Sequence, residues 1–165
     1  MIKRDKGGAI SLSFGFIFSV LVIAAIVAVA FYAISFFLNL GKCADISLFV
    51  QDLQENVDKA WSSEITKETF VGALPRSIES VCFWDGEGEN AGQEFQEIRD
   101  FTRMDRYNMF FYPPENACDQ AANKIEHVDL SVLGWHCFEV NNGKVEILLE
   151  KDSYNPLVVI KKVDR

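Results

Sequence analysis

The most restrictive feature of this sequence is an uncharged stretch of 33 residues, Ala9 to Gly41, which directly follows a basic start. It consists of Ile, Val, Leu, Phe and Ala with scattered Ser and Gly, so it lacks the polar stripe of a soluble amphipathic helix. A bilayer core about 30 Å thick needs roughly 20 apolar residues in a helix. The stretch therefore predicts a transmembrane helix, and it is longer than a plain span requires.

Two other structures share parts of this pattern. A buried core helix rarely runs past about 25 residues without a cap or a break. A cleaved secretory signal has an apolar region of only about 7 to 15 residues that ends in a small-x-small site. Here the apolar run is at least twice as long, and four aromatic residues occupy the place of a signal peptidase cut: Phe31, Tyr32, Phe36 and Phe37. The sequence therefore favours a membrane-embedded helix over both.

The charges that flank the stretch predict its orientation. Lys3, Arg4 and Lys6 precede it, whereas Lys42 is the only basic residue just beyond its far end. Because Lys and Arg near a span tend to stay on the cytoplasmic side, we expect a single-pass protein with a cytoplasmic N-terminus and an extracytoplasmic C-terminal head.

The exported part is strongly acidic. The whole chain has 16 Lys and Arg against 24 Asp and Glu, and the first 42 residues hold four of the basic and one of the acidic residues. The remainder then has 12 basic and 23 acidic residues, a net charge of −11. Such a surface repels nucleic acid and anionic lipid head groups, so we expect no nucleic-acid partner.

The helical pattern continues beyond the apolar stretch but becomes one-sided. Apolar residues recur at spacings of three and four, while Asp, Glu, Asn, Gln and Lys fill the other face; the apolar residues are Ile46, Phe49, Val50, Leu53, Val57, Ala60 and Trp61. No Pro interrupts this region, and Gly41 alone marks a candidate bend. The pattern predicts one helix from about Ser11 to Ser62, whose second half backs a soluble domain.

The remaining residues, from Ser63 to Arg165, predict a small β-rich head. Strands are expected at Ser80–Trp84, Asn108–Tyr112, His136–Val140, Lys144–Lys151 and Leu157–Val163, with a short helix over Gln93–Arg103. The tripeptide Asn141-Asn142-Gly143 supplies the positive-φ residues that a tight hairpin requires. No regular structure is predicted from Glu115 to Gly134.

These patterns together predict the α+β class. A long N-terminal hydrophobic transmembrane helix continues as an amphipathic stalk and is followed by a small antiparallel β-rich head. The expected organisation is a basic leader at 1–8, the apolar helix at 9–41, the amphipathic extension at 42–62 and the extracytoplasmic head at 63–165.

Four cysteines, Cys43, Cys82, Cys118 and Cys137, lie on the side predicted to be outside. An even number in an oxidising compartment favours two disulfides over free thiols, and three pairings are possible. Cys82 and Cys137 each begin a Cys-Phe pair within a predicted strand, which favours them as partners and leaves Cys43 to bond Cys118. A zinc site from the cysteines with His127 and His136 is disfavoured, because zinc ligands usually come as close pairs such as Cys-x-x-Cys.

No catalytic or cofactor-binding group is identified, so we expect neither an enzyme nor a bound cofactor. His127, beside Glu126 and near Asp129, resembles a general base with its orienting carboxylate, but an exposed loop shows the same trio. A second trio alternates with glycine like a calcium loop yet lacks the order of an EF-hand; its residues are Asp85, Glu87 and Glu89. Solvated loops explain both groups.

The N-terminal third resembles an archaeal type IV pilin-like protein, the family that includes archaellins and adhesion pilins. The residues that carry the resemblance are the basic leader ending in glycine, Lys3-Arg4-Asp5-Lys6-Gly7-Gly8, and the long uncharged helix with its amphipathic continuation. The resemblance implies that a prepilin peptidase cuts between Gly8 and Ala9, or less readily after Gly7, and that the apolar helices of many subunits bundle as a filament core. Many type IV pilins carry Glu at the fifth mature position, where this chain has Ser13.

Two functions of different class follow. The first is a structural subunit of an extracellular pilus-like filament, with other copies or related pilin-like subunits, the lipid bilayer and the prepilin peptidase as partners. The second is a single-pass membrane-anchored protein that keeps its N-terminus and binds a partner through its extracytoplasmic head. The over-long helix with its amphipathic extension favours the first.

Overall fold

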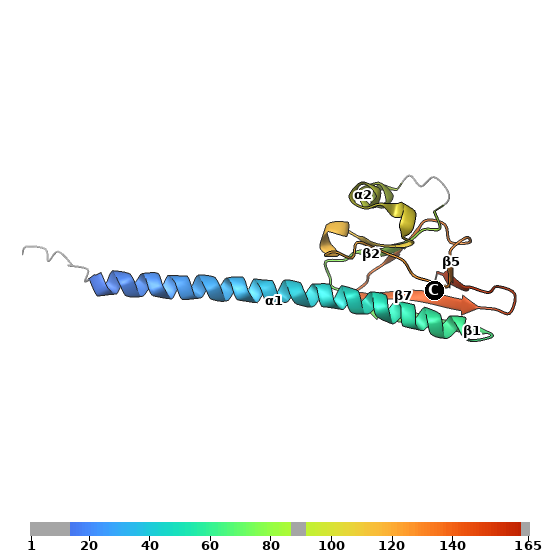
Figure 1. Ribbon diagram of the computed structural model, residues 1–165, viewed down its shortest axis with the longest axis horizontal. Coiled ribbons are helices and arrows are strands. Elements are labelled where there is room, and N and C mark those ends of the chain that lie inside the picture. Colours follow the sequence, from blue (N-terminus) through green and yellow to red (C-terminus); the bar gives the residue numbers. More distant parts are fainter. Residues whose placement is uncertain (1–13, 87–91, 163–165) are drawn as a thin grey trace, which may run out of the picture. The chain divides into compact units, whose positions relative to one another are not determined.

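A computed structural model describes residues 14–86 and 92–162 (Figure 1). The division between the two compact units of the chain falls between Leu40 and Gly41, inside the first helix. That helix is α1, Phe14–Trp61, and it continues through Gly41. The predicted single helix is therefore present over its described part, whereas Ser11 lies outside the described residues.

The described residues of the first unit form one element, the apolar part of α1 from Gly15 to Leu40. An α-helix pairs its own backbone N–H and C=O groups, which is the condition for placing a single segment in an apolar medium. Ser19 in this segment donates its hydroxyl to the carbonyl of Gly15 at 2.8 Å, so this polar side chain is also satisfied within the helix.

The second unit adds two four-stranded sheets to the end of α1. Sheet A has the order β1-β7-β8-β5, with β1 Thr66–Ala73, β7 Lys144–Lys151, β8 Val158–Lys161 and β5 Val128–Asp129. Sheet B has the order β4-β3-β2-β6, with β4 Ala122–Asn123, β3 Met109–Tyr112, β2 Ser80–Phe83 and β6 His136–Glu139. Every described pair is antiparallel except the parallel pair of β5 and β8.

Short helices complete the head. They are α2, Gln93–Phe101, and two single-turn 3-10 helices, η1 Met104–Arg106 and η2 Pro114–Asn116. Figure 1 shows α2 and β7 on opposite sides of β2. The fold is α+β, a long apolar N-terminal helix followed by a small, mainly antiparallel β head, as the sequence predicts.

Sheet B separates two apolar clusters because successive side chains of a strand point to opposite faces. Val81 and Phe83 of β2 belong to the main core, which they share with sheet A and the second half of α1. Cys82, between them, belongs to a second cluster that α2 covers with Phe95 and Ile98. The head is thus built in layers, with the second half of α1 contributing to the main core.

The predicted hairpin at Asn141–Gly143 is confirmed only at its turn, where Asn141 and Lys144 form an antiparallel bridge with N–H···O bonds of 2.8 and 3.1 Å. The turn itself forms, with positive φ at Asn142 and Gly143, but the strands on either side of it enter different sheets. The Val140 N–H donates to Glu79 O at 2.7 Å, which keeps β6 beside β2, while the Leu74 N–H donates to Gly143 O at 2.9 Å, which starts β7 beside β1. The turn is therefore a crossing between two sheets.

Strand β1 was not predicted. Its inner face carries Glu68 and Gly72 beside Phe70, so the alternation of apolar and polar residues that marks a half-buried strand is hidden. Gly72 is needed there because a Cβ at this position would lie 2.2 Å from the Phe49 ring. The segment from Glu115 to Gly134, expected to lack regular structure, holds the two-residue strands β4 and β5.

Candidate functional site

The apolar part of α1 has no partner within the described chain. Every residue from Gly15 to Leu40 is exposed except the half-buried Ala33, and large apolar side chains point out on all sides. Phe31, Phe37 and Leu38, for example, are 65 to 70% exposed. Contiguous exposed apolar surface of this extent marks a site that another molecule or a membrane covers.

This segment also gives the chain its one described helix that is long and apolar enough to cross a membrane, Gly15–Trp61, and none of its apolar window is buried within the protein. A core helix of a soluble protein buries one face against its own chain. The exposed apolar surface therefore extends around the full circumference of the segment from Gly15 to Leu40.

The second half of α1 is buried on one face only. Ile46, Leu53 and Val57 have no exposed surface, and Phe49 contacts the edges of the Phe70 and Phe111 rings at centroid distances of 5.6 and 5.7 Å. Phe70 belongs to β1 and Phe111 to β3, so one helical side chain joins both sheets. This face makes the end of α1 an integral part of the head.

All four predicted cysteines are bonded, in the two pairs that the sequence favoured. Cys43 in α1 is bonded to Cys118, and their Cα atoms lie 5.9 Å apart. Cys118 lies in the loop that follows η2. Cys82 and Cys137 lie directly opposite each other on β2 and β6, with a Cα–Cα distance of 3.9 Å. The first bond joins α1 to the loop after β3, and the second joins two neighbouring strands.

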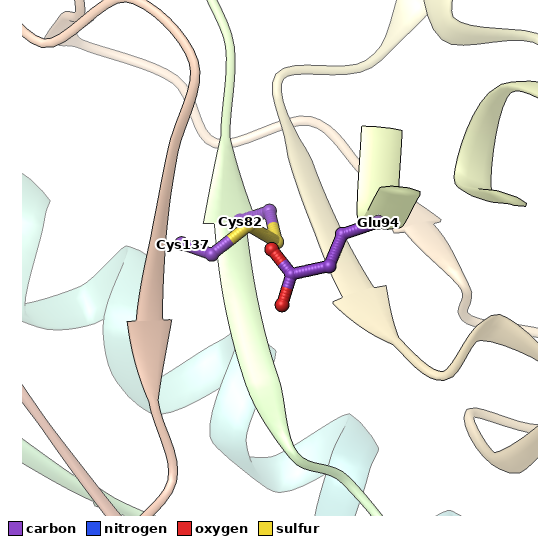
Figure 2. A group of neighbouring side chains, drawn as sticks. All are labelled: Cys82, Glu94 and Cys137. Carbon is purple, nitrogen blue, oxygen red and sulfur yellow. A yellow bond between two sulfur atoms is a disulfide. The ribbon is translucent and has the colours of Figure 1, made fainter. Parts of the chain in front are cut away.

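The Cys82–Cys137 bond has an acidic neighbour, shown in Figure 2. The Glu94 carboxylate points toward the sulfur atoms, and these potential ligand atoms all lie within 4.8 Å of one another. The two sulfur atoms are bonded to each other in the disulfide, so neither is available as the thiolate that a metal ion requires. Glu94 instead accepts a long hydrogen bond of 3.5 Å from the Ser80 hydroxyl. This group is a bonded core feature rather than a metal centre.

The trio around His127, attributed from the sequence to a solvated loop, does not assemble as a catalytic group. His127 Nδ1 lies 2.8 Å from Asp58 Oδ1, and its ring stacks on Trp61 at a centroid distance of 3.9 Å. Asp129 bonds elsewhere, because Ser131 and Asn155 donate to its carboxylate and hold its pKa below the ordinary value. Asp58 lies 69 residues from His127 in the sequence, so no local motif contains both residues.

The other histidine, His136, lies on β6. Its ring contacts the edge of the Phe138 ring at 4.7 Å. Burial, followed by the charge of Lys162, lowers the pKa of His136, which favours the neutral ring near pH 7. A zinc site that combines the cysteines with His127 and His136 therefore lacks its sulfur ligands.

Two groups considered from the sequence fall partly or wholly outside the described chain. The processing site, Gly8 and Ala9, lies before the first described residue. Of the calcium-like trio, Asp85 is described and exposed, while Glu87 and Glu89 are not described.

A cavity of the head with a volume of about 750 Å³ was not predicted. Its apolar floor includes Phe95, Met104 and Leu130, and its rim carries Asp105 and Tyr107. The Arg99 side chain at this cavity is already engaged by Gln96 and Asp100. The lining residues come from segments far apart in sequence, so no local motif marks them.

Comparison with known proteins adds no assignment. No protein-family model matches the chain, and neither a curated protein nor a solved structure matches it.

Proposed function

We propose that this protein is a structural subunit of an extracellular type IV pilus-like filament that assembles through its apolar helix. The observation that carries the proposal is the all-round exposure of Gly15–Leu40 in the same helix whose next residues are buried in the head. Burying a Val, Leu, Ile or Phe side chain contributes about 1.5–3 kcal/mol, so this segment gains strongly from lipid before assembly and from neighbouring helices afterwards.

The proposal includes a location and a processing step. The basic residues Lys3, Arg4 and Lys6 keep the N-terminus in the cytoplasm, so the head is extracytoplasmic. The two disulfides support this orientation, because such bonds persist mainly in oxidising compartments. A prepilin peptidase then removes the leader after Gly8, and the mature chain begins at Ala9.

The head cavity favours a second function, a single-span protein that binds a ligand or partner outside the cell. A concave site of about 750 Å³ with an apolar floor and a polar rim has the size of many small-molecule sites. In this case the leader stays in place and α1 acts as an anchor in lipid.

A charge at Ile26, 64% exposed in the middle of the apolar segment, separates the two functions. In an isolated span, Ile26→Lys costs about 2.5–3.5 kcal/mol of insertion free energy, and snorkelling relieves part of it. In a filament every subunit brings the same charge into a dry bundle, so we expect assembly to be abolished.

The measurement pairs filament yield by electron microscopy with protease resistance of the head, and Ile26→Leu serves as the apolar control. Loss of filaments with an intact head supports the structural subunit. Unchanged filament yield, or native protein that retains Met1 in cells with a prepilin peptidase, would favour the single-span protein.

A further inference from the structure

The Cys43–Cys118 bond lies where the two halves of α1 change character. Cys43 is three residues after Leu40, the last residue of the first unit, and three residues before Ile46, the first fully buried residue of α1. Any tension carried by the apolar segment enters the head at this point. Without a bond here, the tension would load the helix–core contacts one after another, starting with Ile46.

The other end of the bond is anchored in the sheets. Cys118 directly follows Ala117, which has no exposed surface and donates its N–H to Pro114 O at 3.1 Å. The side chain of Asn116 donates to Ser77 O at 3.0 Å, and the N–H of Phe111 in β3 donates to Ala121 O at 3.0 Å. The bond therefore joins α1 to a loop that is fixed on both sides to sheet B.

The second disulfide interleaves with the first. In chain order the cysteines are Cys43, Cys82, Cys118 and Cys137, and the first pairs with the third while the second pairs with the fourth. The two covalent loops therefore overlap, and only the Cys43–Cys118 bond reaches α1.

We propose that Cys43–Cys118 is a mechanical clamp that prevents α1 from being peeled off the head when its apolar half is held and the head is pulled. The proposal rests on the proposed function, in which neighbouring helices or lipid hold the apolar half. With the bond intact, load passes from Cys43 through the sulfur atoms to Cys118 and bypasses the face that starts at Ile46. The segment between Cys43 and Cys118, which are 75 positions apart in sequence, then lies outside the loaded path.

The test stretches single full-length molecules in detergent micelles, held by covalent handles at both termini. Arg165 lies 122 residues beyond Cys43, and the Cys43–Cys118 bond removes 75 of these, leaving 47. The Cys82–Cys137 bond alone removes 55 and leaves 67. At about 3.3–3.6 Å per residue, loss of both bonds lengthens the extended chain by about 260 Å, so each trace reports which bonds it contains.

We expect the paired variant Cys43→Ser with Cys118→Ser to begin unfolding at a clearly lower force than the wild type. The matched control, Cys82→Ser with Cys137→Ser, retains the 47-residue path and should change the first unfolding force less. Equal first forces for the wild type and the Cys43/Cys118 variant overturn the proposal, and so does an equal or larger loss in the control.

If the Cys43/Cys118 variant does not fold, folded wild-type protein is reduced on its tether with a phosphine. One phosphine and one water convert the disulfide to two thiols and a phosphine oxide. The reagent has access at the exposed Cys118, whereas Cys82 has no exposed surface. Molecules that show the 67-residue path should begin to unfold at lower force, and an unchanged force overturns the clamp. Because single molecules are pulled, this result is independent of filament yield, which tests the proposed function separately.

Discussion

The two halves of α1 are one helix by backbone structure but differ in what surrounds them. From Gly15 to Leu40 apolar side chains cover the whole circumference and stay exposed within the described chain. From Gly41 to Trp61 a single apolar face is buried, and most of the exposed residues are charged or polar, with Leu48 and Trp61 as large apolar exceptions. The difference shows that the apolar content of a helix does not by itself say where the helix is buried. The distribution of apolar residues around the helix axis indicates whether the rest of the chain buries one face of the helix or leaves its whole circumference exposed.

The boundary between the halves is sharp. Lys42 is the first charged residue after the apolar segment, Cys43 carries the disulfide and Ile46 begins the buried face. Within about one helical turn, α1 passes from an apolar surface that the described chain leaves exposed to a face that the head buries. The same kind of substitution should therefore destabilise the head in the second half of α1 and leave the head unchanged in the first.

The largest expected effect is that of a charge placed in each half. Leu53 has no exposed surface, so Leu53→Lys buries an unpaired charge and should cost about 5 kcal/mol or more, enough to unfold most of the head. Leu21 is 64% exposed, and Leu21→Lys should leave the head fold unchanged. Thermal unfolding followed by near-ultraviolet circular dichroism of the full chain in detergent measures both variants. A head that unfolds in the Leu21 variant would break the comparison.

A smaller effect is expected from removing one aromatic ring in each half. Phe49→Ala deletes the ring that joins Phe70 and Phe111 and should lower the free energy of unfolding by about 3–5 kcal/mol. Phe31 is 69% exposed, so Phe31→Ala should change it by less than about 0.5 kcal/mol. Denaturant titration of the head gives both values, and similar losses would contradict the assignment of the two environments.

An added methyl group at Gly72 tests how closely the second half of α1 approaches the sheet. A Cβ at this position would lie 2.2 Å from the Phe49 ring, so Gly72→Ala should displace the ring and cost about 1–3 kcal/mol. Combining Gly72→Ala with Phe49→Leu should recover part of this loss, because the smaller side chain leaves space for the methyl group. No recovery in a double-mutant cycle would show that the cost arises elsewhere.

The smallest expected effect concerns pH. No carboxylate lies between Gly15 and Leu40, so acid sensitivity should come from groups in the head such as Asp129. Bonds from the Ser131 hydroxyl and backbone, with Asn155, lower the pKa of Asp129, so its stabilising contribution is complete above the unfolded pKa near 3.9 and is lost as the pH falls through the lower folded pKa. Asp129→Asn should flatten this part of the stability curve, and an unchanged acid slope would exclude Asp129 as a contributor.

Much of the head was readable from local sequence, and the exceptions have specific causes. Strand β3 ends where Pro113 follows, and α2 shows helical spacing in Phe95 and Ile98. Strand β1 was missed because Glu68 and Gly72 occupy its inner face. The turn at Asn142 and Gly143 was predicted, but turn chemistry fixes backbone angles and does not say which strand pairs with which.

The candidate sites likewise divide into those that the local sequence reveals and those that depend on contacts between distant residues. The apolar segment of α1 and the four cysteines were visible in the sequence, since each signal is carried by residue type and spacing. The Asp58 partner of His127, the Glu94 side chain beside Cys82–Cys137 and the head cavity were not. Each of these depends on residues brought together from separate elements.

By itself, the sequence determined the long α1 helix, its change from all-round to one-sided apolar character, and the α+β class of the protein. These properties are local, because helix formation and side-chain periodicity depend on residues within a few turns. Only the tertiary structure decided that β6 and β7 separate into different sheets, that Phe49 joins the two sheets, and which of the three possible cysteine pairings forms. Those outcomes depend on which apolar faces and strand edges come into contact between distant parts of the chain. No single segment determines the free energy of such long-range packing.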